Sequence, residues 1–235
     1  MNQAALGFRA HSGWTALVAV SLEHDGPHVL ARERPMLVET FTYEFRQPYH
    51  TAEKMPRDRA HEFISRIESG ATRLAKEAIR SVQTDIRKQG YELTCFGLPI
   101  ASTRPLPKLD KILESHALIH AADGELFRRA LIHASERCHA MAFTIKEREL
   151  LVFACKTLRI KSDDLRRRLT AIGKLIGSPW SQDEKFAVLA AWLALLSSKG
   201  HPNLGAEVNS KGRAVNRKSF VPKGPYGLRQ DSSRS

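Results

Sequence analysis

Polar side chains that could take part in chemistry stand at two points of the sequence where predicted strands end. His11 and Ser12 follow the first apolar segment, and Gln47, Tyr49 and His50 follow the third. If these segments pair as antiparallel hairpins, both groups lie at one rim of a sheet. An imidazole beside a hydroxyl can activate a nucleophile, but no nucleophile elbow and no identifiable orienting acid accompany this pair. We therefore predict a ligand-binding rim rather than a hydrolytic triad.

A second group of histidines has the spacing of one helical turn. His116 and His120 precede Asp123 and Glu125, and two imidazoles with a carboxylate on one helical face could bind zinc. If residues 117–119 are extended instead, both histidines lie on one face of a strand. The sequence contains no HExxH motif and no cysteine near this pair. This pattern is more typical of ordinary polar or capping histidines, and we predict no metal ligand here.

Three strands joined by hairpins are predicted to position the polar rim. Residues 4–22 are rich in alanine, valine and leucine and predict a strand built around a small-residue kink. An Asp-Gly step at 25–26 predicts the first hairpin turn, and residues 28–34 and 36–45 predict the second and third strands. Pro35 predicts a break or an edge position between those two strands.

The rest of the chain alternates helices with two further strands. Apolar residues at steps of three and four predict a long helix over 57–89 that packs one stripe on the sheet. Further helices are predicted at 108–114, 123–138, 144–157, 162–175 and 186–196, with strands at 91–100 and 141–145. Capping boxes at 144–147 and 181–184 mark two of the helix starts. This order predicts an α/β protein with a mixed sheet and helices on both faces.

The element order and two motifs resemble the ribonuclease H-like superfamily, which includes Holliday-junction resolvases of the RuvC kind. Residues 7–14 are similar to the first-strand region Gly-x-Asp-x-Gly-x-x-x-Gly-Trp of those proteins, and residues 182–192 are similar to their last helix. The resemblance covers 4–198 in element order and only these two segments in motif. It implies three N-terminal antiparallel strands followed by parallel strands.

The resemblance also implies a chemistry, which this sequence meets poorly. Enzymes of the superfamily hold two divalent metal ions with clustered carboxylates. Of the matching positions, only Asp183 and Glu184 in the last helix are acidic; the first strand offers Ala10, His11 and Ser12, and residues 99–103 contain no acid. Glu39 or Glu44 on the predicted third strand could compensate. We therefore predict that the standard two-metal nuclease site has been lost.

Three functions remain open at this point. The first is a ribonuclease H-like binding or adaptor module that is not a nuclease. The second is a hydrolase with a rearranged site, in which Glu39, Asp183 and His11 or His50 surround one Mg²⁺ or Mn²⁺ ion; a metal cofactor is expected only in this case. The third is a protein-interaction domain. The sequence leaves open whether the chain is an enzyme.

Charge is concentrated at the C-terminal end. The chain has a net charge of +12, and half of it lies in residues 199–235, which contain eight lysines and arginines against two acids. This segment has no sustained apolar period, so we predict one domain over 1–198 and a disordered basic tail. Such a tail could neutralise nucleic-acid phosphates or act as solubilising surface.

Composition also predicts a cytoplasmic protein with no membrane partner. No apolar run approaches the roughly 18 residues of a membrane-spanning helix, and the N-terminus lacks the features of a secretory signal. Cys95, Cys138 and Cys155 are odd in number and far apart, which indicates no disulfide framework and fits a reducing compartment.

Overall fold

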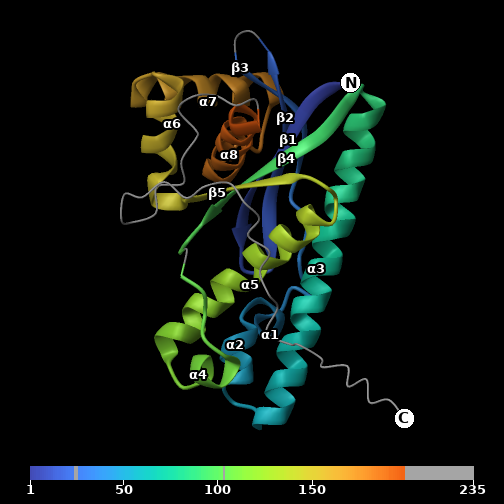
Figure 1. The fold of residues 1–235 in the computed structure, drawn as a ribbon, viewed down its shortest axis with the longest axis vertical. Coiled ribbons are helices and arrows are strands. Elements are labelled where there is room, and N and C mark those ends of the chain that lie inside the picture. Colours follow the sequence, from blue (N-terminus) through green and yellow to red (C-terminus); the bar gives the residue numbers. More distant parts are fainter. Residues whose placement is uncertain (24–25, 103, 199–235) are drawn as a thin grey trace, which may run out of the picture.

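A computed structural model describes residues 1–23, 26–102 and 104–198, and it contains a five-stranded mixed sheet (Figure 1). The strands lie in the order β3-β2-β1-β4-β5. β1 pairs antiparallel with β2, and β2 with β3, while β4 and β5 run parallel to β1. Their bounds are Asn2–His11, Trp14–Glu23, Gly26–Glu33, Tyr91–Ile100 and Met141–Lys146. The predicted α/β mixed sheet, with antiparallel strands first and parallel strands after, is confirmed.

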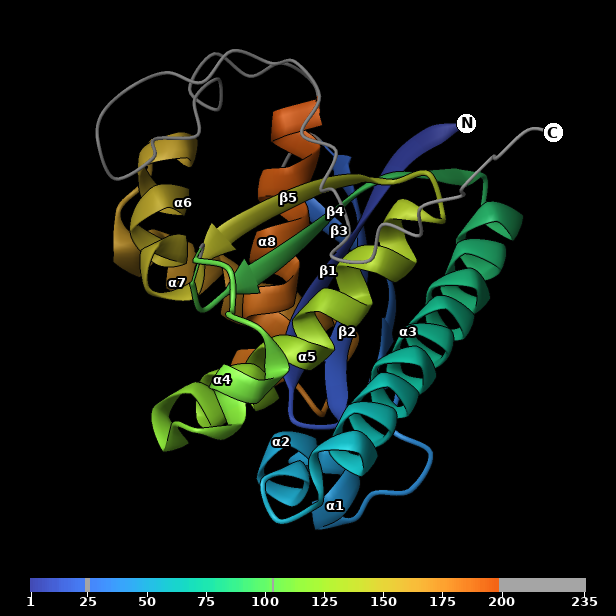
Figure 2. The ribbon, with the colours of Figure 1, turned by 60° about the horizontal axis from the view of Figure 1, so that its bottom comes forward.

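Helices cover both faces of this sheet, as predicted (Figures 1 and 2). The long α3 and α5 lie on one face, and α8 lies on the other with α6 and α7 beside it. The helices are α1 (Tyr43–Arg46), α2 (Pro48–Ala52), α3 (Arg57–Lys88), α4 (Leu109–Leu113), α5 (His116–Glu136), α6 (Leu150–Leu158), α7 (Ser162–Ile176) and α8 (Gln182–Ser198), with a 3-10 turn, η1, at Glu147–Glu149.

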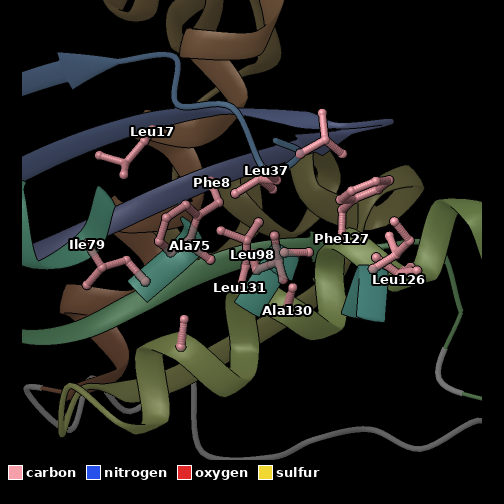
Figure 3. Packing of buried hydrophobic residues seen from close by; sticks show 14 of the residues in the cluster. Phe8, Leu17, Leu37, Ala75, Ile79, Leu98, Leu126, Phe127, Ala130 and Leu131 are labelled. Atoms are coloured by element: carbon pink, nitrogen blue, oxygen red, sulfur yellow. The ribbon is translucent and has the colours of Figure 1, made fainter. Parts of the chain in front are cut away.

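Alternation along β1 divides its side chains between two hydrophobic cores. Leu6 and Phe8 point toward α3 and α5, where Phe8 meets Phe96 of β4 edge to face. Figure 3 shows Phe8 among the side chains of this core, with Leu98 and Leu131 nearby. Ala5 points to the opposite face and packs in the core formed with α8. Odd-numbered residues of β1 therefore face α8.

Two glycines let α8 lie almost directly on the sheet. A Cβ atom on Gly7 of β1 would lie 1.7 Å from the carbonyl oxygen of Ala187, and one on Gly97 of β4 would lie 2.1 Å from that of Ala190. No real side chain fits at such distances, so these strands and α8 touch through their backbones. This close packing fixes where the first turn of α8 lies relative to the C-terminal end of β1.

Two strand predictions at the N-terminus need correction. Residues 4–22 form two strands rather than one, because Ser12 and Gly13 make a tight turn in which Gly13 has a φ of +89°. The predicted strand at 36–45 is wrong. Pro35 ends the pairing after β3, a single bridge joins Met36 to Trp14, and the chain then leaves the sheet and enters α1.

Helix starts were predicted with mixed success. α5 begins at His116 rather than at 123, because Ile119 and Ala122 continue the buried stripe of this helix toward its N-terminus. The capping box at 144–147 is wrong, since residue 144 belongs to β5 and α6 begins only at Leu150. The box at 181–184 is confirmed: the backbone N–H of Ser181 donates to Glu184 Oε2 at 2.7 Å.

Two further expectations concern the basic tail and a membrane-spanning helix. The predicted tail at 199–235 lies outside the described residues. Among the helices that the structure describes, none joins sufficient length to sufficient hydropathy for a membrane span.

Candidate functional site

The C-terminal end of β1 presents two side chains to the first turn of α8. Arg9 and His11 follow Gly7 at two-residue steps, so the pleat of the strand points both toward α8. Arg9 Nη1 donates to Asp183 Oδ1 at 2.6 Å, and His11 Nε2 lies 3.0 Å from the same oxygen. Asp183 is the second residue of α8, where the helix dipole favours a carboxylate.

Arg9 also holds a second carboxylate from a different part of the chain. Its Nη2 donates to Glu147 Oε1 at 2.7 Å, and Glu147 directly follows β5. The guanidinium lies over the ring of Phe186, with Cζ 4.8 Å from the ring centroid. We refer to Arg9, His11, Glu147 and Asp183 as the Arg9 cluster. In it, one permanently charged guanidinium bridges two carboxylates, a geometry that favours strong, directional hydrogen bonds.

A tryptophan and a second arginine flank the Arg9 cluster. The ring of His11 stacks on Trp14, with centroids 4.3 Å apart and planes 7° from parallel. Arg34 lies over the Trp14 ring, with Cζ 5.2 Å from its centroid, and pairs with Glu184 at 2.6 Å. Burial alone would raise the pKa of Glu184, but hydrogen bonds from Ser181 and Arg34 lower that pKa below its ordinary value.

These pairings decide what the Arg9 cluster can do chemically. A divalent metal binds through carboxylate oxygens, and Arg9 holds one oxygen of each carboxylate that flanks β1 here, Asp183 Oδ1 and Glu147 Oε1. A guanidinium is a cation with five N–H donors and no acceptor, so it can bridge two carboxylates. One guanidinium thus offsets half of the negative charge of two carboxylates and occupies one oxygen of each.

Two residues of the Arg9 cluster, Arg9 and Glu147, were not among the predicted site residues. The motif of the resembling family places its acid two residues after the first glycine, and here that position is Arg9 rather than residues 10–12. Period-2 alternation from Gly7 would have identified it as a residue facing the last helix. Glu147 was missed because it was assigned to a capping box.

The structure brings together only some of the predicted site residues. His11 and Asp183 are in contact, as the hydrolase hypothesis required. Glu39 is not beside them: its exposed side chain pairs with Arg73 of α3 at 2.6 Å. The carbonyl of Ser12 lies 3.4 Å from Nε of Arg46, at the end of α1.

The remaining predicted residues, Gln47, Tyr49 and His50, lie at α2, and the last two bind α5 instead of the Arg9 cluster. Gln47 precedes α2 and accepts a hydrogen bond from Thr51. The backbone N–H of Tyr49 donates to Asp123 Oδ1 at 2.8 Å, and His50 Nδ1 lies 2.5 Å from Asp123 Oδ2. Burial raises the pKa of Asp123, against the lowering effect of these hydrogen bonds.

A basic groove of 460 Å³ runs between α3 and α5 on the face opposite to α8. Figure 2 shows these two helices side by side. The polar residues along it are Glu68, Ser69, Thr72, Arg73, Lys76, Arg129, His133 and Arg137. Arg73 and Arg129 pair with nearby glutamates, whereas Lys76 and Arg137 have no carboxylate partner among the described residues. The groove therefore offers cationic groups to an anion.

Comparison with known proteins gives structural neighbours only. No protein-family model matches the chain, and no curated protein matches its sequence. The RuvC structure of Thermus thermophilus is similar, with 12% sequence identity and a TM-score of 0.46, over 84% of this chain and 97% of that one. The structure of T. thermophilus RuvC in complex with a Holliday junction substrate has 10% identity and a TM-score of 0.47, over 84% and 96% of the two chains.

Proposed function

We propose that this chain is a ribonuclease H-like domain that binds nucleic acid and does not cleave it. The observation that carries this proposal is the salt-bridged position of Arg9. Its guanidinium lies between Asp183 and Glu147, at the end of the first strand. The resemblance implied a first-strand carboxylate in the corresponding place. A cation of the protein thus stands where a metal-dependent enzyme needs an anion.

Electrostatics explains why this replacement opposes metal binding. The guanidinium would repel a divalent ion about 4 Å away by about 8 kcal/mol at an effective dielectric constant of about 20, which cancels about half of the attraction that Asp183 and Glu147 would exert at that distance. The ion would also have to displace two charge-assisted hydrogen bonds of 2.6 and 2.7 Å. Both effects disfavour the two-metal arrangement that phosphodiester cleavage uses.

The binding half of the proposal comes from the distribution of positive charge. Lys76 and Arg137 project into the groove between α3 and α5 without a described acidic partner. The segment 199–235 adds half of the chain's net charge of +12. Lysines and arginines that neutralise phosphates give affinity without sequence preference and with a strong dependence on salt.

A binding and cleavage assay with a labelled four-way DNA junction and a matched duplex tests this function. We expect the full chain to bind at low salt and to leave both substrates intact in Mg²⁺ or Mn²⁺. Binding should weaken steeply as salt rises. Divalent-dependent cleavage that Asp183→Asn abolishes would establish the hydrolase alternative instead. A failure to bind either DNA would favour the protein-interaction alternative.

Charge-reversal variants locate the binding surface. Lys76→Glu with Arg137→Glu should weaken binding at least tenfold and reduce the salt slope by about two, since each phosphate contact contributes about 0.9. Arg166→Glu with Lys174→Glu, on exposed positions of α7, makes the same change of charge on the other face of the sheet. An equal loss in both pairs would refute the groove as the contact surface. Deleting 199–235 should also weaken binding and its salt dependence.

A further inference from the structure

Three histidine rings converge where α2 meets the first turns of α5. His50 comes from α2, and His116 and His120 come from one face of α5. One potential ligand atom of each histidine lies within 4.8 Å of the other two. The Nε2 atoms of His116 and His120 are 3.0 Å apart, and the ring centroids of His50 and His120 are 4.4 Å apart. We call these three residues the histidine cluster.

A buried carboxylate holds one of these rings in place. Asp123 is only 4% exposed and accepts from His50 Nδ1, which leaves Nε2 of His50 for another partner. The second oxygen of Asp123 accepts the backbone N–H of Tyr49, so the carboxylate is itself fixed. In metalloproteins, a carboxylate bonded to the other ring nitrogen of a ligating histidine orients the ring and raises its basicity. Asp123 and His50 have this relationship.

The donor set selects the kind of ion. Imidazole nitrogens suit zinc and the neighbouring transition metals, whereas Mg²⁺ and Ca²⁺ prefer oxygen. With Zn–N bonds of about 2.0–2.1 Å, tetrahedral ligand nitrogens are about 3.3 Å apart. The pair on α5 already has nearly this spacing. His50 lies on a helix of five residues, and its ligand atom is within 4.8 Å of the other two, so closing to about 3.3 Å needs a shift of about 1.5 Å.

We propose that His50, His116 and His120 form a divalent transition-metal site, best suited to zinc, with Asp123 as the positioning residue. Three protein ligands leave the fourth coordination position to water, as in zinc sites that act on a substrate. The ion would also join α2 to the N-terminal end of α5. This site is separate from the Arg9 cluster and does not depend on nucleic-acid binding.

Zinc titration of the metal-free full chain by calorimetry tests the proposal. We expect about one tightly bound Zn²⁺ per chain, and Mg²⁺ should not compete for it. His116→Ala and His120→Ala change exposed side chains, so both variants should fold, and each should weaken zinc binding at least a hundredfold. Asp123→Asn should weaken it about ten- to a hundredfold, because the loss acts through the orientation of His50.

A matched variant and a second readout keep this test decisive. His133→Ala removes an exposed histidine further along α5 and should leave zinc affinity unchanged. Zinc should raise the melting temperature of the wild type and of His133→Ala, but not that of His116→Ala. Equal zinc affinity in the wild type and in His116→Ala, or an equal loss in His133→Ala, would overturn the assignment. Neither result depends on Asp183 or on DNA, so this proposal and the proposed function fail separately.

Discussion

Replacing Arg9 with methionine should remove the cation that bridges Asp183 and Glu147 while keeping an apolar side chain over Phe186. The change breaks two charge-assisted hydrogen bonds, to Asp183 and Glu147. Such bonds contribute about 1.5–3 kcal/mol each when a charged group is involved. The three side chains are 18–33% exposed, so solvent screening reduces this contribution. We expect the free energy of unfolding to fall by about 3 kcal/mol in total.

Thermal and urea unfolding of Arg9→Met measure this loss directly. For a domain of this size, about 3 kcal/mol corresponds to a fall of roughly 6–12 °C in melting temperature. Arg73→Met is the matched control, because Arg73 also pairs with two glutamates, at 2.6 and 3.1 Å, but at an exposed surface. It should lose far less stability. If Arg9→Met unfolds no earlier than Arg73→Met, the bridging role assigned to Arg9 is refuted.

Two further predictions concern the packing and the charge of α8. Gly97→Ala should lower the free energy of unfolding by about 3 kcal/mol, because its Cβ would lie 2.1 Å from the Ala190 carbonyl oxygen. As a control, Gly70→Ala places a methyl group in open space on α3 and should raise the free energy of unfolding by about 0.5–1 kcal/mol. Urea unfolding measures both variants, and equal effects would contradict the close approach of α8. Glu184→Gln should cost about 2 kcal/mol at neutral pH, because the ionised carboxylate bonds Arg34. The pKa of Glu184 is lowered in the folded state, so this contribution is present above pH 4.5 and is lost as the pH falls through the folded pKa. The free energies of unfolding of the wild type and of Glu184→Gln should therefore converge in acid. A difference that persists there would contradict the stabilising role of the ionised Glu184.

Much of the fold follows from local patterns that survive tertiary packing. The period of three and four over 57–89 predicted α3 within a residue or two, because one apolar stripe was enough to specify it. The capping box at 181–184 marked the start of α8, since its hydrogen bonds are local. The strand at 36–45 failed for the opposite reason: Leu37 and Val38 are buried by packing under the β1–β2 turn, not by pairing in the sheet.

The candidate sites depend on contacts that no local pattern specifies. Arg9 and Glu147 are 138 positions apart and meet only because β1 and β5 lie on either side of β4. His50 reaches His116 and His120 because α2 packs on α5, after a segment that sequence reasoning assigned to a strand. The sequence already grouped His116 and His120 with Asp123, but it did not indicate that His50 joins them or that Asp123 is buried and bonded to His50.

Calorimetric titration of Mn²⁺ into the full chain, beside the same chain carrying Asp183→Asn, asks whether Arg9 has displaced the metal site. We expect the two isotherms to superimpose, because Arg9 holds one oxygen of each carboxylate and its charge repels the metal. Binding at the histidine cluster would contribute equally to both proteins, and His116→Ala identifies it. Saturable Mn²⁺ binding in the wild type that Asp183→Asn removes would refute the loss of the metal site, because the ion would then compete successfully with Arg9.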